Sequence, residues 1–281
     1  MPRFLSIGHV ARDEFPGGAH RLGGTGLYAA ATAARLGVET ALVTRVGPNE
    51  RDEVTRICAD LGIDVRVLDA NVTTTFAFRW NEDGTRILTL KARAKGIATR
   101  DVPQDLRSAD EVVFGTIARE LSGDLLLGGT GRVSVLMAQG LLRMWDADGT
   151  VRPTAWERAE QDIRALTAVV LSEDDVAGDT SAVARWSAVT PVVLTLAERG
   201  CRIYESGHPT AELPAYPPTR MADTTGAGDT FAAGLAIGLG EGRSLPDACR
   251  FANAVASFGL EGEGITALAT RDAVERRLAG S

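Results

Sequence analysis

The chain has 281 residues, with 30 basic and 37 acidic side chains and a formal net charge of −7. Its 44% hydrophobic and 24% charged residues are typical of a globular protein, which excludes wholesale disorder. The negative charge argues against a general nucleic-acid binder and against a protein that coats anionic membranes. The only lysines are Lys91 and Lys95, and neither follows a glycine-rich loop. A Walker-type phosphate loop needs such a lysine, so this class of NTPase is excluded.

The cysteines and the apolar runs bear on the compartment. Cys58, Cys201 and Cys249 are far apart and odd in number, and they form no C-x-x-C motif. This usage predicts a reducing interior, with the three thiols buried as small apolar groups. Charged residues interrupt the N-terminal apolar run early, and no run approaches the roughly 20 apolar residues of a membrane span. We expect a soluble cytoplasmic protein without a membrane partner.

Short apolar segments alternate along the chain with segments of helical pattern. The segments expected as buried strands are residues 4–7, 41–46, 111–114, 133–137, 168–171 and 192–196. The segments expected as helices are residues 26–36, 50–61, 154–166, 180–188, 227–239, 245–260 and 271–278. The strands lack strict alternation of apolar and polar residues, which is typical of a parallel sheet covered on both faces. The pattern predicts a layered α/β fold.

One region breaks this alternation. Residues 73–80 and 85–91 are rich in β-formers and flank an Asp83-Gly84 turn, which predicts a hairpin. Residues 12–22 are expected to add a strand to it. We therefore expect one domain over residues 1–281, with lid elements at about 12–22 and 72–96 inserted in it.

The most informative segment is residues 223–231, Asp-Thr-Thr-Gly-Ala-Gly-Asp-Thr-Phe, which precedes a run of small apolar residues. Gly226 and Gly228 allow a tight turn and close approach of a ligand to the backbone. The N–H groups at the start of the following helix would bind an anion. Asp229, in the first helical turn, could then act as the base for an attacking hydroxyl. The alternative is an ordinary capped helix start.

Two further features precede the first helix. Gly23 and Gly24 suit close approach of a substrate, or simply packing of the helix on the first strand. A dinucleotide site is disfavoured, because no acidic residue stands at the end of the next expected strand, 41–46. Asp13 follows the first strand, where a carboxylate can hold two vicinal hydroxyls; alternatively it is merely solvated.

Taken together, these motifs resemble the ribokinase/PfkB family of carbohydrate kinases. The segment 223–231 resembles the C-terminal signature of that family. Asp13, the glycine pair and residues 195–200 precede it in the same order as in the family, so the resemblance covers essentially the whole chain. The resemblance implies a ribokinase-like three-layer α/β/α fold, with a mostly parallel sheet and a small β lid. It also implies ATP-dependent phosphorylation of a hydroxyl in a cleft between the body and the lid.

The resemblance also implies roles for individual residues. Asp229 matches the general base, and Gly226, Ala227 and Gly228 match the anion hole. The positions that match substrate contacts are Asp13, Gly23 and Gly24. The positions that match the surroundings of the nucleotide are Thr195, Gly200 and Asn253. The backbone around Asp223 and Thr225 matches a monovalent-cation site, for K⁺, that many members possess.

Some positions depart from the family pattern. Ser172-Glu173-Asp174-Asp175 stands where the family has Asn-x-x-Glu, which serves Mg²⁺ and its waters. We expect Ser172 to replace the Asn near the nucleotide and Asp175 to replace the Glu with a shorter arm. Thr25 and Ala11 stand where ribokinase carries Lys and Asn, so ribose is a poor candidate acceptor.

Residues 135–143 resemble the inositol-kinase-like branch, in which a Gln-Gly/Ala-x-x-Arg run follows a strand. Gln139 and Arg143 would then hydrogen-bond a polyol or a second charged group. Alternatively, Arg143 forms only a surface salt bridge with Asp146 or Asp148.

The leading hypothesis is an ATP- and Mg²⁺-dependent kinase that acts on a small sugar or polyol. The alternatives are a nucleoside kinase of the same fold and a non-catalytic ligand-binding regulatory protein, which the departure at residues 172–175 favours. The aromatic strand with Phe76, Phe78 and Trp80 would either pair two lids in a homodimer or face the cleft.

Overall fold

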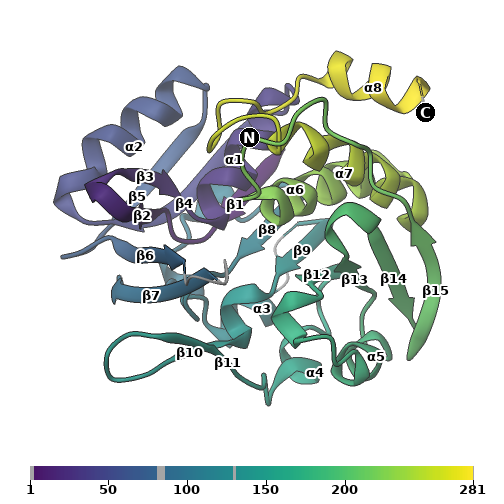
Figure 1. The fold of residues 1–281 in the computed structure, drawn as a ribbon, viewed down its shortest axis with the longest axis horizontal. Coiled ribbons are helices and arrows are strands. Elements are labelled where there is room, and N and C mark those ends of the chain that lie inside the picture. The colour runs from purple at the N-terminus through teal and green to yellow at the C-terminus, as the bar shows by residue number, and fades with distance from the viewer. Residues whose placement is uncertain (1–2, 81–85, 129–130, 281) are drawn as a thin grey trace.

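The computed structural model describes residues 3–80, 86–128 and 131–280. In this part of the chain the larger sheet has nine strands in the order β15-β14-β13-β12-β9-β8-β1-β4-β5 (Figure 1). The strands are β1 (Phe4–Ile7), β4 (Thr40–Val46), β5 (Asp64–Asp69), β8 (Glu111–Gly115), β9 (Val133–Met137), β12 (Ala168–Ser172), β13 (Val192–Thr195), β14 (Cys201–Glu205) and β15 (His208–Leu213). The seven strands from β13 to β5 are parallel to one another. At the other edge, β14 pairs antiparallel with β13, and β15 pairs antiparallel with β14.

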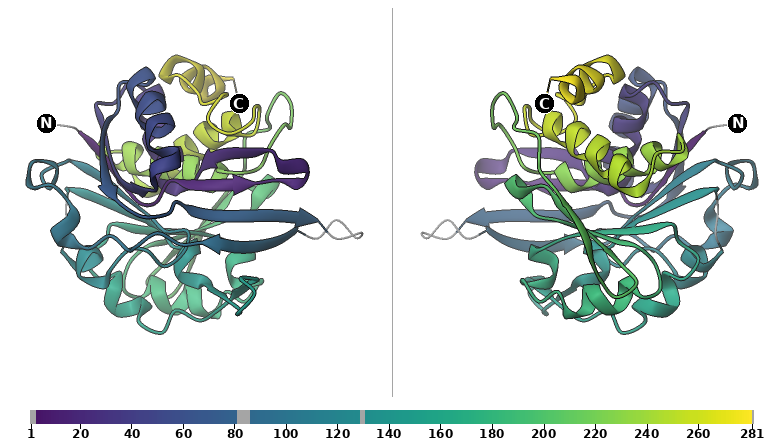
Figure 2. Two further views of the ribbon diagram at one scale, coloured as in Figure 1. Left: turned by 90° about the vertical axis from the view of Figure 1, so that its left-hand side faces the viewer. Right: turned by 90° about the vertical axis from the view of Figure 1, so that its right-hand side faces the viewer.

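Helices cover both faces of this sheet (Figures 1 and 2). One face carries α1 (Thr25–Arg35), α2 (Pro48–Asp60), α6 (Ala227–Gly240), α7 (Leu245–Gly259) and α8 (Arg271–Ala279). The other carries α3 (Gly123–Leu127), α4 (Ala159–Asp162) and α5 (Ser181–Ser187). Successive residues of β1 take part in different cores: Phe4 packs with α1 and α6, whereas Leu5 and Ile7 pack with α3 to α5. The predicted three-layer fold with a mostly parallel sheet is confirmed.

The second sheet forms the lid. It consists of β2 (Ala11–Glu14), β3 (His20–Gly23), β6 (Thr74–Trp80) and β7 (Arg86–Ala92), in the order β3-β2-β6-β7. The strands project together from one side of the body (Figure 2). The prediction that residues 12–22 join the hairpin is confirmed, with two strands instead of one. The expected Asp83-Gly84 turn lies outside the described residues.

The sequence-based expectations failed where side chains are polar or where tertiary contacts interrupt a helix. The sequence patterns do not predict the two edge strands, β5 and β15, or β14 beside β15; β5 and β15 carry mostly half-buried or exposed residues. The helix expected at 154–166 is wrong, because only α4 is helical there. Trp156 turns into the core and its indole N–H donates to Asp162, which ties the segment into a compact loop. The short pair β10 (Arg143–Trp145) and β11 (Val151–Pro153) was also missed.

The topology brings the predicted site residues together. The carboxyl ends of β1, β9, β12 and β13 lie on the same side of the sheet, where the lid strands begin and the N-terminus of α6 arrives. Within residues 3–80, 86–128 and 131–280, no helix is long and apolar enough to cross a bilayer.

Candidate active site

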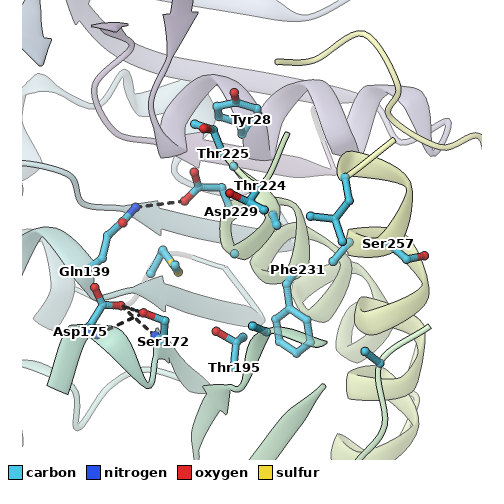
Figure 3. Close-up of a pocket in the computed structure, with 18 of the residues that line it drawn as sticks. Tyr28, Gln139, Ser172, Asp175, Thr195, Thr224, Thr225, Asp229, Phe231 and Ser257 are labelled. Atoms are coloured by element: carbon cyan, nitrogen blue, oxygen red, sulfur yellow. Dashed lines mark hydrogen bonds between the residues drawn. The ribbon is translucent and has the colours of Figure 1, made fainter. Parts of the chain in front are cut away.

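A cavity of about 630 Å³ lies between the lid and the carboxyl ends of the parallel strands (Figure 3). The predicted site residues that line it are Asp13, Gly24, Gln139, Arg143, Ser172, Asp175, Thr195, Gly200, Thr225, Gly226, Ala227, Gly228, Asp229 and Asn253. Gly23 and Asp223 are not among its lining residues. Positions more than 200 residues apart in the sequence therefore meet at one cavity.

Asp229 lies in the first turn of α6 and is only 6% exposed. Its Oδ1 accepts a hydrogen bond of 2.7 Å from the Thr25 hydroxyl, and the Gln139 amide lies 3.4 Å from the same oxygen. Burial raises the pKa of Asp229 to about 7, although the Thr25 hydrogen bond and the charge of Arg143 lower it. A carboxyl group with a pKa near neutrality is suited to accept a proton from an alcohol.

The turn before Asp229 exposes backbone donors. Gly226 caps α6 with φ of 83°, and a Cβ at this position would lie 2.3 Å from the Tyr28 ring, so only glycine fits. Among the described residues, the N–H groups of Gly228 and Asp229 have no hydrogen-bond acceptor. These donors and the dipole of the 14-residue α6 form a site for an anion beside the carboxylate.

Asp13 faces the cavity from β2 and is 4% exposed. A Cβ at Gly23, on the adjacent β3, would lie 2.5 Å from Asp13 Oδ2. Gly23 therefore makes room for this carboxylate. Gly24 has φ of 86°, and a Cβ there would lie 2.5 Å from the carbonyl oxygen of His9. The glycine pair thus serves close packing, and only Gly24 also borders the cavity.

Gln139 and Arg143 lie at the two ends of the short helical turn that follows β9, and their side chains are hydrogen-bonded to each other. Arg143 Nη2 donates to Gln139 Oε1 at 2.9 Å, and Arg143 Nη1 lies 3.4 Å from the carbonyl oxygen of Ile117. Arg143 also lines the cavity, whereas Asp146, one of the two carboxylates considered for a mere surface salt bridge, binds Arg152.

The opposite wall contains Ser172 and Asp175, which bind each other. The backbone N–H and the hydroxyl of Ser172 both donate to Asp175 Oδ2 at 2.8 Å, and Asp175 N–H donates back to Ser172 Oγ at 3.2 Å. Thr195 and Gly200 line the same wall, and Gly200 has φ of 94° in a turn that no Cβ would fit. The side-chain amide of Asn253 donates to the carbonyl oxygen of Pro214 at 3.1 Å and to Cys201 Sγ at 3.5 Å, so its N–H groups are bound within the protein.

The residues expected at metal sites differ in how well they fit. The described residues contain no cluster of three or more His, Cys, Asp or Glu side chains that could hold a metal ion. Asp175 fits an ion such as Mg²⁺, which keeps several waters and binds mainly to phosphates, because its Oδ1 accepts no hydrogen bond within the described chain. The carboxylate of Asp223 fits a monovalent cation poorly, since Arg21 and the Thr225 N–H already bind its two oxygens at 2.6 and 2.9 Å. The monovalent-cation site expected at the backbone around Asp223 and Thr225 stays a prediction.

The sequence analysis assigned no contact to three residues of this region. Thr25 donates to Asp229, Tyr28 packs against Gly226, and Arg21 pairs with Asp223. The only signal for them was their position beside the glycine pair, since each contact joins segments far apart in the sequence. Of the aromatic residues expected either to pair two lids or to face the cleft, Phe76 and Phe78 line the cavity. The side chain of Trp80 lies outside the described part of the chain, and the homodimer stays a prediction.

Comparison with known proteins identifies the family. The pfkB family carbohydrate kinase model matches residues 10–271. Ribokinase of Bacillus subtilis is 40% identical over 90 residues, which are 30% of this chain and 29% of that protein. Inositol 3-kinase of Arabidopsis thaliana is 44% identical over 72 residues, 25% of this chain and 19% of that protein. These matches thus span less than a third of either relative.

Solved structures extend the similarity to the whole fold. A pyrophosphate-dependent kinase in the ribokinase family, complexed with a pyrophosphate analog and myo-inositol, has a TM-score of 0.81 at 22% identity, covering 97% of this chain and 99% of that chain. Ribokinase of Arabidopsis thaliana, complexed with ribose and ATP, has a TM-score of 0.77 at 20% identity and covers 100% of this chain and 99% of its own.

Proposed function

Because the chain belongs to the pfkB family of carbohydrate kinases, we propose that it transfers the γ-phosphate of ATP to a hydroxyl of a small polyol or sugar of inositol-like type. One observation carries this proposal. A buried carboxyl group, Asp229, with a pKa of about 7 lies one residue from backbone N–H donors that the described chain leaves without acceptors. A ligand-binding protein has no need for a proton acceptor beside an anion site, whereas phosphoryl transfer to an alcohol requires both.

In the proposed reaction, the ionised Asp229 accepts the proton of the acceptor hydroxyl as its oxygen attacks the γ-phosphorus. The P–O bond to ADP breaks, and the N–H groups of Gly228 and Asp229 stabilise the charge on the phosphoryl oxygens. The Thr25 hydrogen bond and Gln139 hold the carboxylate in one orientation. Mg²⁺, when bound, neutralises the β- and γ-phosphates, and Asp175 would hold it through water.

The acceptor end of the cavity suits a ring that carries hydroxyls. Asp13 and Gln139 provide polar groups, whereas Phe76, Ile117 and Met137 provide an apolar surface. A carboxylate accepts hydrogen bonds from two vicinal hydroxyls, and a cyclic polyol has a less polar ring face for the aromatic side. The local similarity to an inositol 3-kinase supports the same class of acceptor.

The donor end favours a nucleotide over pyrophosphate alone. The cavity lining also includes Ala215, Tyr216, Ala256 and Leu260, whose apolar surface suits a purine base. Pyrophosphate has no such group to cover this surface. Because a structural neighbour binds a pyrophosphate analog, the experiment compares ATP with pyrophosphate as the donor.

The test is a two-way screen of phosphoryl donors and acceptors. The purified chain is incubated with ATP or pyrophosphate and with inositols, other polyols, hexoses, ribose or nucleosides, and the phosphorylated product is measured by mass spectrometry. We expect ATP-dependent transfer to a cyclic polyol or a hexose. Transfer confined to nucleosides would establish the nucleoside-kinase alternative. Tight binding of a polyol without transfer from either donor would establish the regulatory alternative.

A further inference from the structure

The Arg21–Asp223 ion pair joins the lid to the loop that begins the anion site. Arg21 belongs to β3 of the lid, and Asp223 precedes Gly226 by three residues. Arg21 Nη2 donates to Asp223 Oδ2 at 2.6 Å, and Thr225 N–H donates to Oδ1 at 2.9 Å. The side chains are only 23% and 16% exposed, so water screens this pair weakly.

Asp223 creates an electrostatic problem for phosphate binding. Both oxygens of Asp223 accept hydrogen bonds, one from the guanidinium of Arg21 and one from the Thr225 N–H, and such donors stabilise the ionised carboxylate. An uncompensated carboxylate three residues before the anion site would repel the phosphates that this site has to bind. The positive charge of Arg21, next to Asp223, offsets the carboxylate and so removes that repulsion.

The structure holds the guanidinium of Arg21 in place on several sides. It lies 5.2 Å from the centre of the Phe15 ring, a cation–π distance. Gly264 approaches so closely that a Cβ there would lie 2.9 Å from Arg21 Cδ. The carboxylate of Glu263 is 3.9 Å away, but its side chain is 81% exposed and contributes little. Arg21 is thus a fixed part of the fold rather than a mobile surface residue.

These contacts leave little scope for a monovalent cation at Asp223. Both carboxylate oxygens already accept hydrogen bonds, and a neighbouring guanidinium repels a second cation. A K⁺ site that uses the carboxylate of Asp223 therefore does not fit the residues present.

We propose that Arg21 is a built-in cation of this enzyme: it neutralises Asp223 and positions the loop 223–226, so that phosphoryl transfer needs no monovalent ion. This inference rests on the proposed kinase activity. Arg21 acts through the loop and is a positioning residue. It also links the lid strand β3 to the anion site.

The first experiment measures ATP-dependent turnover of the wild-type chain in KCl and in choline chloride at equal ionic strength. We expect rates within about twofold of each other. Activation by K⁺ of roughly tenfold or more over choline would overturn the proposal. Thermal unfolding of the same samples provides a readout without turnover: K⁺ should not raise the melting temperature relative to choline, and a clear K⁺-specific rise would count against the proposal.

Substitutions test the residue itself. Arg21→Met should lower kcat by roughly tenfold or more, whereas Arg21→Lys, which keeps the charge, should retain most of it. The matched control is Arg12→Met, because Arg12 also joins the lid to the body, through Glu50 at 3.3 Å, but lies away from the loop 223–226. Equal losses in Arg21→Met and Arg12→Met would show a general lid effect and would overturn the proposal.

A double-mutant cycle separates this inference from the proposed function. In Arg21→Met/Asp223→Asn, the carboxylate that needs neutralising is gone, so the double variant should lose less melting temperature than the sum of the two single losses. Additive losses would overturn the proposed pairing. The cycle measures melting temperatures, so it can be carried out even if no acceptor is phosphorylated. In that case the proposed function fails, and the cycle still tests the pairing of Arg21 with Asp223.

Discussion

The two walls of the cavity differ in how their polar groups are satisfied. On the transfer side, Asp229 is buried, its pKa is raised, and the adjacent N–H groups have no acceptor in the described chain. On the donor side, Ser172 and Asp175 satisfy each other, and the amide of Asn253 is bound to the carbonyl oxygen of Pro214. A buried polar group without a hydrogen-bond partner costs free energy, and a bound ligand can recover that free energy by supplying the partner. The transfer side is therefore where substitutions should affect the reaction most.

The largest effect should come from Asp229→Asn. The amide keeps the size of the side chain and its carbonyl oxygen can still accept from Thr25, but it cannot accept a proton. We expect kcat to fall by about 10³-fold, the range for loss of a general base, while the Kd for ATP changes little. Steady-state kinetics and calorimetric titration with ATP measure the two quantities.

The same variant should be more stable than the wild type at high pH. The pKa of Asp229 in the folded chain, about 7, lies above its ordinary value of 3.8, so the native state loses stability as pH rises from about 4 to about 7, and the loss persists at higher pH. Asp229→Asn should therefore raise the melting temperature at pH 8 and have little effect near pH 4. Near-wild-type turnover in this variant would disprove the assignment of the base.

The next largest effect should come from Gly226→Ala. The added Cβ would lie 2.3 Å from the Tyr28 ring, in addition to the strain of φ at 83°, so the turn that presents the N–H groups must move. We expect a loss of roughly 100-fold in kcat, as for removal of an oxyanion-hole donor. Kinetic assays of the purified variant provide the measurement.

Gly242→Ala is the matched control for this substitution. Gly242 has φ of 84°, but a Cβ there would meet nothing within 4 Å. Both variants incur the strain of a positive φ, of order 1 kcal/mol, and only Gly226→Ala meets the ring. If the two variants lost the same turnover, the strain and not the geometry of the anion site would explain the effect.

Thr25→Val should have a smaller effect that is visible in the pH profile. The hydroxyl of Thr25 stabilises the ionised form of Asp229 and lowers its pKa, so its removal should raise that pKa further. In the wild type, kcat/KM should fall as pH drops below about 7, because protonated Asp229 cannot act as a base. In Thr25→Val this fall should begin at higher pH, with about a tenfold loss at pH 7.

Thr32→Val provides the comparison for Thr25→Val. Thr32 is also a buried residue of α1, but its hydroxyl donates to the carbonyl oxygen of Tyr28 and not to Asp229. It should change the melting temperature without moving the pH profile. An unshifted profile in Thr25→Val would show that this hydrogen bond does not tune the base.

How much of this could be predicted from the sequence depends on the range of the contacts involved. The buried strands are encoded by local apolar runs, and the segment 223–229 contains its glycines, its acid and its helix start within seven residues. Arg21 and Thr25 could not be assigned, because their partners Asp223 and Asp229 lie 202 and 204 residues away. The helix expected at 154–166 failed for a similar reason, since the Trp156–Asp162 contact overrides local propensity.

The smallest effect should come from the donor wall, and Asp175→Asn tests it. The Oδ2 of Asp175 is already bound by Ser172, so only one oxygen remains for water around Mg²⁺, whose main ligands would be the phosphates. We expect the Mg²⁺ concentration for half-maximal rate to rise by no more than about tenfold, the low end for loss of an outer-shell partner, with little change in kcat at saturating Mg²⁺.

Asp174→Asn is the control, because it removes the same charge from an exposed neighbour. An equal shift in both variants would indicate a general charge effect. A loss in Asp175→Asn as large as that in Asp229→Asn would remove the distinction between the two walls, since it would place an essential carboxylate where one carboxylate oxygen is already bound by Ser172.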